Sequence, residues 1–235
     1  DASFDSPEHL VHDLRLYGYY GGIRLLKAVS KRFFEYCAAH SIEIPKVNFT
    51  AEYKINIPRL VGLSGSSAIC TAMLKALMKF YNVEIPFEYT PTICLEAERD
   101  ELDINAGFQD RVIQMYNGLV YMDFDRAFVE ANNFGRYERI DASLMPNVFV
   151  AYDANRAEES GKAHHAVRRL FEAKNRDVVS AMSEFADIAK RGRDALLAGR
   201  KDEIASLVNA NFDLRDKIFD VAEEKNRSEG SDALV

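Results

Sequence analysis

Residues 58–68 read PRLVGLSGSSA and hold two glycines and three serines within a short turn. Apolar and polar side chains alternate before it, over residues 47–61, as they do in strands. After it, apolar residues recur every three or four positions as far as Tyr81, which predicts a helix. Glycines let a backbone curl around an anion, and the free N–H groups at a helix start attract phosphate. The stretch therefore predicts a strand, a phosphate-binding turn and a helix in that order.

The same residues are also consistent with a tight, serine-capped turn that binds no ligand, because such turns are common between a strand and a helix. The turn contains no lysine, so it is not a Walker A motif. At the level of local chemistry, a phosphate site and a ligand-free turn therefore both stay open.

The rest of the chain changes character near residue 145. Helices are predicted over residues 10–39 (with a break at 18–22), over 90–100, and from Asp110 onward. Strands are predicted over residues 47–61, 119–124 and 148–152, the last of them buried. From residue 160 onward the pattern is almost purely helical and predicts three helices. Strands in the first two-thirds and helices in the last third favour an α+β fold of the two-layer α/β type, with domains 1–145 and 146–235.

The composition is that of a folded globular chain, because 48% of its 235 residues are hydrophobic and 29% are charged. The formal net charge of −7 argues against nucleic acid or an anionic membrane as the main partner. No apolar run approaches the roughly 20 residues of a membrane helix, and no signal peptide opens the sequence. Cys37, Cys70 and Cys94 have no CxxC spacing, which predicts reduced core thiols in a cytoplasmic protein rather than disulfides or a zinc site.

Four segments, in order along the chain, resemble the GHMP small-molecule kinases. Residues 58–68 resemble the second motif of this family, P-x-x-x-G-L-G-S-S-A, with Ser64 as an inserted residue. Residues 17–28 (YGYYGGIRLLKA), 107–124 (GFQDRVIQMYNGLVYMDF) and 160–168 are similar to segments of the glucuronokinases within that family. Four ordered segments are far more specific than any one of them.

The resemblance implies an enzyme that uses ATP and Mg²⁺ to phosphorylate the anomeric hydroxyl of D-glucuronate, giving glucuronate 1-phosphate and ADP. Two alternatives stay open: a kinase for galacturonate, galactose or a related sugar, and a non-catalytic, kinase-like protein that holds a nucleotide or a sugar. The fold implied is a ribosomal S5 domain 2-like N-terminal domain followed by a helix-rich, ferredoxin-like C-terminal domain.

By the same resemblance, Asp110, in the G-x-x-D sequence that starts at Gly107, is the catalytic residue. It would accept the proton of the anomeric hydroxyl, or hold this hydroxyl in line with the γ-phosphate. Ser67 and Glu98 would bind Mg²⁺ through oxygen, which this hard cation prefers. The ATP phosphates would lie against the turn, formed by Gly62, Leu63, Ser64, Gly65, Ser66, Ser67 and Ala68.

From the residue pattern alone, other roles for these side chains stay open. Asp110 begins a helical pattern and can serve as its N-cap. Glu98 stands in a charge-rich helix, where carboxylates usually face solvent. For the neighbouring Arg111 we favour a surface ion pair over a role in neutralising the transferred group.

Contacts to the sugar are predicted from charge and shape. Glucuronate carries a carboxylate, which an arginine, a lysine or a helix N-terminus would bind. Arg59, Lys162, His164 and His165 are candidates for this carboxylate, and Tyr121 could stack on the sugar ring. A surface position for the basic residues, and a core position for the tyrosine, explain the same sequence.

Two motifs that the resemblance implies do not occur in the 235 residues. The first would precede residue 1, and a third, glycine-rich motif would follow residue 220. We expect both to lie outside this sequence, so the chain alone is expected not to turn over substrate. The partners expected are ATP and a sugar acid, bound by a cytoplasmic monomer or homodimer.

Overall fold

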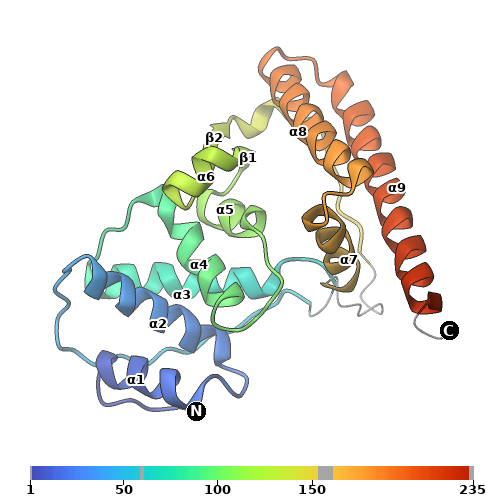
Figure 1. The fold of residues 1–235 in the computed structure, drawn as a ribbon. Helices are drawn as coiled ribbons and strands as arrows, with labels where there is room; N and C mark the ends of the chain where they lie inside the picture. The colour runs from blue at the N-terminus through green and yellow to red at the C-terminus, as the bar shows by residue number, and fades with distance from the viewer. Residues whose placement is uncertain (1, 59–60, 153–160, 233–235) are drawn as a thin grey trace. The chain divides into compact units, whose positions relative to one another are not determined.

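The computed structural model describes residues 2–58, 61–152 and 161–232 (Figure 1). For residues 161–165 and 223–232 it describes the backbone alone. The chain divides into two compact units, Asp1–Glu138 and Arg139–Val235. The division expected between residues 145 and 146 lies near this point, and nucleotide and phosphate binding by residues 1–145 stays a prediction.

The first unit consists mainly of helices. Its helices are α1 (Pro7–Tyr17), α2 (Arg24–Ala39), α3 (Gly65–Tyr81), η1 (Phe87–Tyr89), α4 (Thr90–Arg99), α5 (Phe108–Tyr116) and α6 (Arg126–Asn132). A two-stranded sheet pairs β1 (Leu119–Asp123) with β2 (Arg136–Ile140), which begins in this unit. The predicted break between two N-terminal helices, the helix through Tyr81 and the strand near 119–124 are confirmed.

The core of the first unit lies between α2, α3 and α4. Val29 and Phe33 of α2 and Leu74 of α3 are completely buried there, and Phe33 stacks on Tyr81 with ring centroids 5.9 Å apart. Cys37, Cys70 and Cys94 are buried in the same core, as predicted. Burial raises the pKa of Cys37 to about 11 and that of Cys94 to about 12, so these thiols stay protonated at neutral pH.

The prediction of a strand before the turn is wrong for the described part of that segment, because residues 47–58 adopt no strand there. Their apolar side chains instead cover one face of α3. The Phe49 ring lies 5.6 Å from that of Phe80, and Ile55 and Ile57 approach Gly65. The alternation of side chains therefore reflects one-sided packing on a helix, without a partner strand.

The prediction of a strand over residues 148–152 is also wrong. These residues adopt no strand, and Phe149 is 95% exposed. An apolar run alone therefore did not identify a buried strand here. The sequence analysis also missed β2, whose sequence RYERI mixes charged and apolar residues. Gly135 allows its approach to β1, because a Cβ there would lie 2.7 Å from the Asp123 carbonyl oxygen.

The second unit begins with the end of β2 and is otherwise helical where it has regular structure, and the helices predicted from residue 160 onward are confirmed. They are η2 (Ala142–Leu144), α7 (Gly161–Glu172), α8 (Arg176–Leu197) and α9 (Asp202–Asp232). Helices α8 and α9 lie side by side and share the buried residues Val178, Ala181 and Ile218 (Figure 1). The fold is thus rich in helix, has a small sheet and is compatible with the α+β class. The S5-like and ferredoxin-like arrangements stay predictions.

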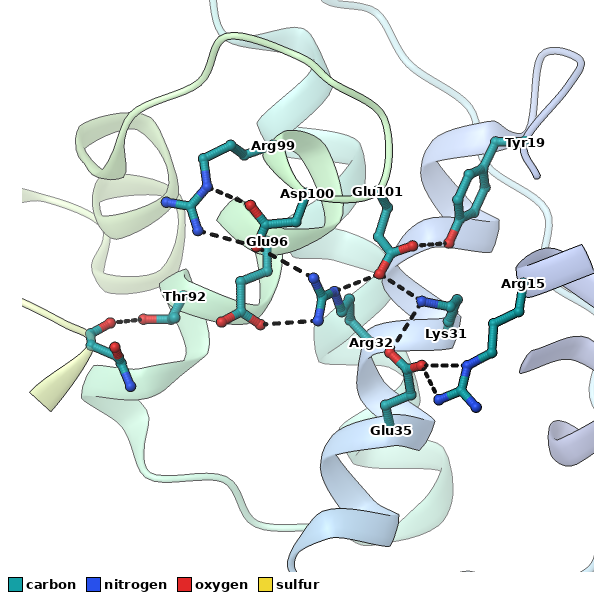
Figure 2. Close-up of polar contacts among 11 residues, drawn as sticks. Arg15, Tyr19, Lys31, Arg32, Glu35, Thr92, Glu96, Arg99, Asp100 and Glu101 are labelled. Carbon is teal, nitrogen blue, oxygen red and sulfur yellow. Dashed lines mark hydrogen bonds and ion pairs between the residues drawn. The ribbon is translucent and has the colours of Figure 1, made fainter. Parts of the chain in front are cut away.

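An ion-pair network holds α1 and α4 against α2 (Figure 2). At its centre, Glu101 lies 2.6 Å from Lys31 Nζ and 2.8 Å from Arg32 Nε, and Tyr19 Oη donates to its other oxygen at 2.6 Å. Burial alone would raise the pKa of Glu101. The hydrogen bonds from Lys31 and Tyr19, together with the positive charges of Lys31 and Arg32, outweigh burial, and the pKa of Glu101 is lowered.

The lowered pKa of Glu101 makes its contribution to stability depend on pH. The folded protein holds this proton less tightly than the unfolded chain, so the contribution is present above the unfolded pKa and is lost as pH falls through the folded pKa. We expect Glu101→Gln to lower the free energy of unfolding in urea by about 1–3 kcal/mol at pH 7. This difference from the wild type should shrink as pH falls from 6 to 3.

Glu84→Gln provides the control, because Glu84 is exposed. This variant should differ from the wild type by no more than about 0.5 kcal/mol at any pH. A loss in Glu101→Gln that stays constant across the pH range would contradict the role of the Glu101 charge.

Candidate active site

The serine-rich turn enters α3 through two residues with left-handed backbone conformation. Gly62 has φ 75° and Ser64 has φ 55°. Ser64 occupies the N-cap position, yet in the described part of the chain its side chain makes no capping hydrogen bond. The serine cap of the ligand-free alternative is therefore not formed, and the binding of phosphate at this turn stays a prediction. The first N–H groups of α3 donate no hydrogen bond to the N-cap side chain.

The carbonyl oxygen of Ser64 links this turn to two helices. It accepts hydrogen bonds from the Ala68 amide at 3.1 Å and from the Ser67 hydroxyl at 2.9 Å, both on α3. It also accepts a longer one, at 3.4 Å, from Gln114 Nε2 on α5. Ser67 itself is completely buried, and its oxygen donates here while its lone pairs remain able to bind a cation. The turn is thus fixed against α5.

Glu98 lies in the core, which overturns the alternative of a solvent-facing carboxylate. Its exposure is 0%, and it shares the buried face of α4 with Cys94 and Ala97. Arg111 binds only one of its oxygens: Nε donates to Oε2 at 2.7 Å, and Nη2 donates to the same oxygen. The other oxygen, Oε1, is buried and has no hydrogen-bond partner among the described residues.

Arg111 was expected to form a surface ion pair, and this is wrong in one respect. The ion pair with Glu98 exists, but it is buried, since Arg111 is only 4% exposed. The guanidinium also donates through Nη1 to the Gly107 carbonyl at 2.9 Å and to Asp110 Oδ2 at 3.5 Å. Arg111 therefore joins the end of α4 to the start of α5.

Asp110 is the third residue of α5 and its side chain is 48% exposed. The N-cap of α5 is Gly107, so the alternative that Asp110 caps this helix is wrong. Residues four apart lie on one face of a helix, and Asp110 lies four before Gln114, which reaches the turn. Asp110 is therefore on the face of α5 that is turned toward the start of α3.

Within the group of Glu98, Asp110 and Arg111, two carboxylates and one guanidinium leave one net negative charge. A further cation, Lys75 of α3, donates to the Gln114 carbonyl oxygen on α5 at 2.8 Å. Burial raises the pKa of the Cys70 thiol, and the nearby charge of Glu98 raises it further. Cys70 follows Ser67 by one turn of α3. The electrostatic effect of Glu98 on Cys70 therefore places its charge near the first turns of that helix.

The residues present fit a magnesium ion that is shared with a ligand. Glu98 offers a buried carboxylate oxygen without a partner, and Ser67 offers a hydroxyl oxygen. Mg²⁺ is commonly bound by one or two protein oxygens together with substrate phosphates. No group of three or more His, Cys, Asp or Glu side chains in the described residues could hold a metal by itself. A cation here would therefore need the phosphates as further ligands.

Residues 24–118 match the family model described as the GHMP kinases N terminal domain. The resemblance to the GHMP kinases is thereby confirmed. Two curated relatives from Arabidopsis thaliana, "Glucuronokinase 1" and "Probable glucuronokinase 2", are 43% and 45% identical to the chain over 220 and 221 residues. Both alignments cover 93% of this chain and 60% of the relative. The chain thus spans about three-fifths of the length of the relatives it matches. No solved structure was found to match.

The segment matched to the GHMP kinases contains the turn, Glu98 and the Asp110–Gln114 face of α5. Of the residues predicted to contact the sugar, Tyr121 is half-buried on β1. Arg59 lies outside the described residues. His164, His165 and Lys162 belong to α7 in the second unit, and their side chains also lie outside the described part. All five sugar contacts stay predictions.

Every helix among the described residues is too short or too polar to span a membrane.

The contact of Gln114 with the Ser64 carbonyl and the burial of Glu98 and Arg111 were not predicted. Helical spacing indicated only the burial of Glu98. Glu98 follows the buried Cys94 by four residues and Ala97 by one, which places it on the core face of α4. No local pattern indicates that Arg111 reaches Glu98, because the two are separated by a loop.

The burial of the ion pair predicts a strong thermodynamic coupling. Glu98→Gln and Arg111→Met each leave one buried partner uncompensated, and each should lower the free energy of unfolding by about 3–5 kcal/mol. The double variant should lose clearly less than the sum of both. Urea denaturation measures all three.

The exposed pair of Arg126 and Glu130 on α6, with Nε and Oε1 2.6 Å apart, provides the matched control. Its double-mutant cycle should give a coupling of no more than about 0.5 kcal/mol. Additive losses for Glu98 and Arg111 would mean that the two side chains do not stabilise one another.

Proposed function

We propose that this protein is a sugar 1-kinase, which transfers the γ-phosphoryl group of ATP to the anomeric hydroxyl of D-glucuronate. The products would be glucuronate 1-phosphate and ADP. The observation that carries the proposal is that Arg111 contacts both Glu98, whose Oε1 is buried without a partner among the described residues, and the half-exposed Asp110. The choice of glucuronate is supported by the names of the two Arabidopsis relatives.

The turn and the first residues of α3 bind the ATP phosphates in this proposal. The N-terminus of a helix carries about half a positive charge, and its N–H groups point toward an anion. Gly62 has no side chain to obstruct a phosphate, and its backbone makes the turn that aims these N–H groups. The hydrogen bond from Gln114 to the Ser64 carbonyl supports the turn from α5.

Mg²⁺, held by Ser67 and Glu98 together with the phosphates, would neutralise charge on the phosphates. The protein residues position the acceptor. Arg111 lies against Asp110 Oδ2, which leaves Oδ1 available to take the proton of the sugar hydroxyl or to align this hydroxyl. Because phosphoryl transfer depends mostly on positioning and charge, one aligned carboxylate is sufficient.

The sugar carboxylate would be bound by one or more of Arg59, Lys162, His164 and His165, and the ring by Tyr121. Arginine is suited to this task because its planar fork matches a carboxylate. ATP and a sugar acid are thus the proposed small-molecule partners. The cytoplasmic location and the choice between monomer and homodimer also stay predictions.

The test of Asp110 is its isosteric amide. We expect Asp110→Asn, assayed in the whole protein, to lose at least about 100-fold in turnover of glucuronate, because the amide cannot accept the proton. The affinity for Mg²⁺ and a non-hydrolysable ATP analogue should change little. Coupled detection of ADP release measures the first quantity, and calorimetry measures the second.

Asp177→Asn provides the matched control, because Asp177 also lies in the first turn of a helix, α8. This variant should keep its turnover. Full activity in Asp110→Asn would rule out the role of Asp110. The wild type should also be tested with galacturonate and galactose: equal rates with these sugars would overturn the choice of glucuronate, and nucleotide binding without any turnover would overturn the kinase.

A further inference from the structure

We propose that Arg111 is a positioning residue for the cation and the acceptor. It holds Glu98 by one oxygen so that the other faces a divalent cation, and it ties the same guanidinium to Asp110. The proposal rests on the function proposed above for this site. It adds a residue that acts through its neighbours, without itself touching a reacting atom.

The ion pair between Arg111 and Glu98 is asymmetric. A paired arginine and carboxylate commonly form two parallel hydrogen bonds, one to each oxygen. Here Nε and Nη2 both donate to Oε2 of Glu98. Oε1 is left buried without a partner among the described residues. A pair that served only to stabilise the fold would have no reason to leave a buried charged oxygen unbonded.

The guanidinium of Arg111 joins Glu98, Gly107 and Asp110. Nη1 binds the Gly107 carbonyl at 2.9 Å and lies 3.5 Å from Asp110 Oδ2. Gly107 is the N-cap of α5, so this contact fixes the start of the helix that carries Asp110. A rotation of Arg111 would therefore displace Glu98 and Asp110 together.

The charges of the three residues support the same role. Glu98, Arg111 and the half-exposed Asp110 together keep one net negative charge, which a divalent cation would convert to a positive one. Without Arg111, two carboxylates would face the anionic phosphates. Lysine cannot substitute, because a single ammonium is a point charge and lacks the planar fork that reaches Glu98, Gly107 and Asp110 at once.

Arg32 on α2 offers a matched comparison (Figure 2). It also forms ion pairs with α4 and the residues after it, at 3.9 Å from Glu96, 3.3 Å from Asp100 and 2.8 Å from Glu101. Its side chain is partly exposed, and each of its carboxylate partners lies outside the candidate site. Arg32→Lys therefore tests what the loss of an arginine fork does to stability alone.

The experiment measures Mn²⁺ affinity in the whole protein, with a non-hydrolysable ATP analogue present, from the electron paramagnetic resonance of free Mn²⁺. We expect Arg111→Lys to bind Mn²⁺ at least about tenfold more weakly than the wild type, as other changes around metal ligands do. Its kcat should fall more than its KM for glucuronate changes. Glu98→Gln should also lose Mn²⁺ affinity.

The control, Arg32→Lys, also removes an arginine fork and should keep Mn²⁺ affinity within about twofold of the wild type, with a smaller shift of the urea midpoint than in Arg111→Lys because Arg32 is partly exposed. Equal Mn²⁺ affinity in the wild type and Arg111→Lys would overturn the proposal. Arg111→Gln is made in parallel. If neither Arg111 variant folds, Arg111 is a structural residue and the proposal is likewise overturned.

The outcomes also separate this proposal from the proposed function. Weak Mn²⁺ binding by Arg111→Lys, combined with a wild type that phosphorylates no sugar, would support the role of Arg111 and overturn the kinase. A wild type that phosphorylates glucuronate, with Mn²⁺ affinity and kcat unaltered in Arg111→Lys, would support the kinase and overturn the role of Arg111.

Discussion

The buried ion pair between Glu98 and Arg111 holds α4 and α5 together beside the start of α3. Both charges are removed from water, which is expensive, and the pair repays this cost only if its remaining hydrogen-bonding groups are satisfied. Arg111 meets this condition through Gly107 and Asp110, whereas Glu98 does not, because Oε1 has no partner among the described residues. This contact fixes Glu98 relative to Asp110, and Gln114 on the same helix α5 reaches the turn.

The proposed site would let an acidic chain bind anions. The net charge of −7 would repel ATP and a sugar acid if it acted uniformly. Positive potential is needed only locally, and in the proposed site the start of α3 would provide it without any basic side chain in the described turn. Glu98 and Ser67 can add a cation at the same place. The overall charge of the protein therefore says little about the ligands of this site.

Sequence reasoning found the parts of the fold that follow from helical spacing. The helical pattern over residues 10–39, to which Val29, Phe33 and Cys37 belong, identified α2. The turn before α3 was recognised from its glycines and serines. It failed at Phe49 and Phe149, because alternation or an apolar run was taken for a strand where no strand forms. Asp110 and Glu98 were found through family resemblance. The reach of Arg111 across a loop to Glu98 could not be predicted, since no local pattern encodes it.

The proposed site requires that Glu98 offer Oε1 to a cation while Arg111 retains Oε2. The most direct measurement is a crystal structure of the whole protein with Mg²⁺ and a non-hydrolysable ATP analogue. The account predicts Mg²⁺ about 2.0–2.1 Å from Oε1, the phosphates against the first turn of α3, and Arg111 still bound to Oε2. A cation held elsewhere, or an Oε1 that remains without a ligand while the nucleotide is bound, would contradict it.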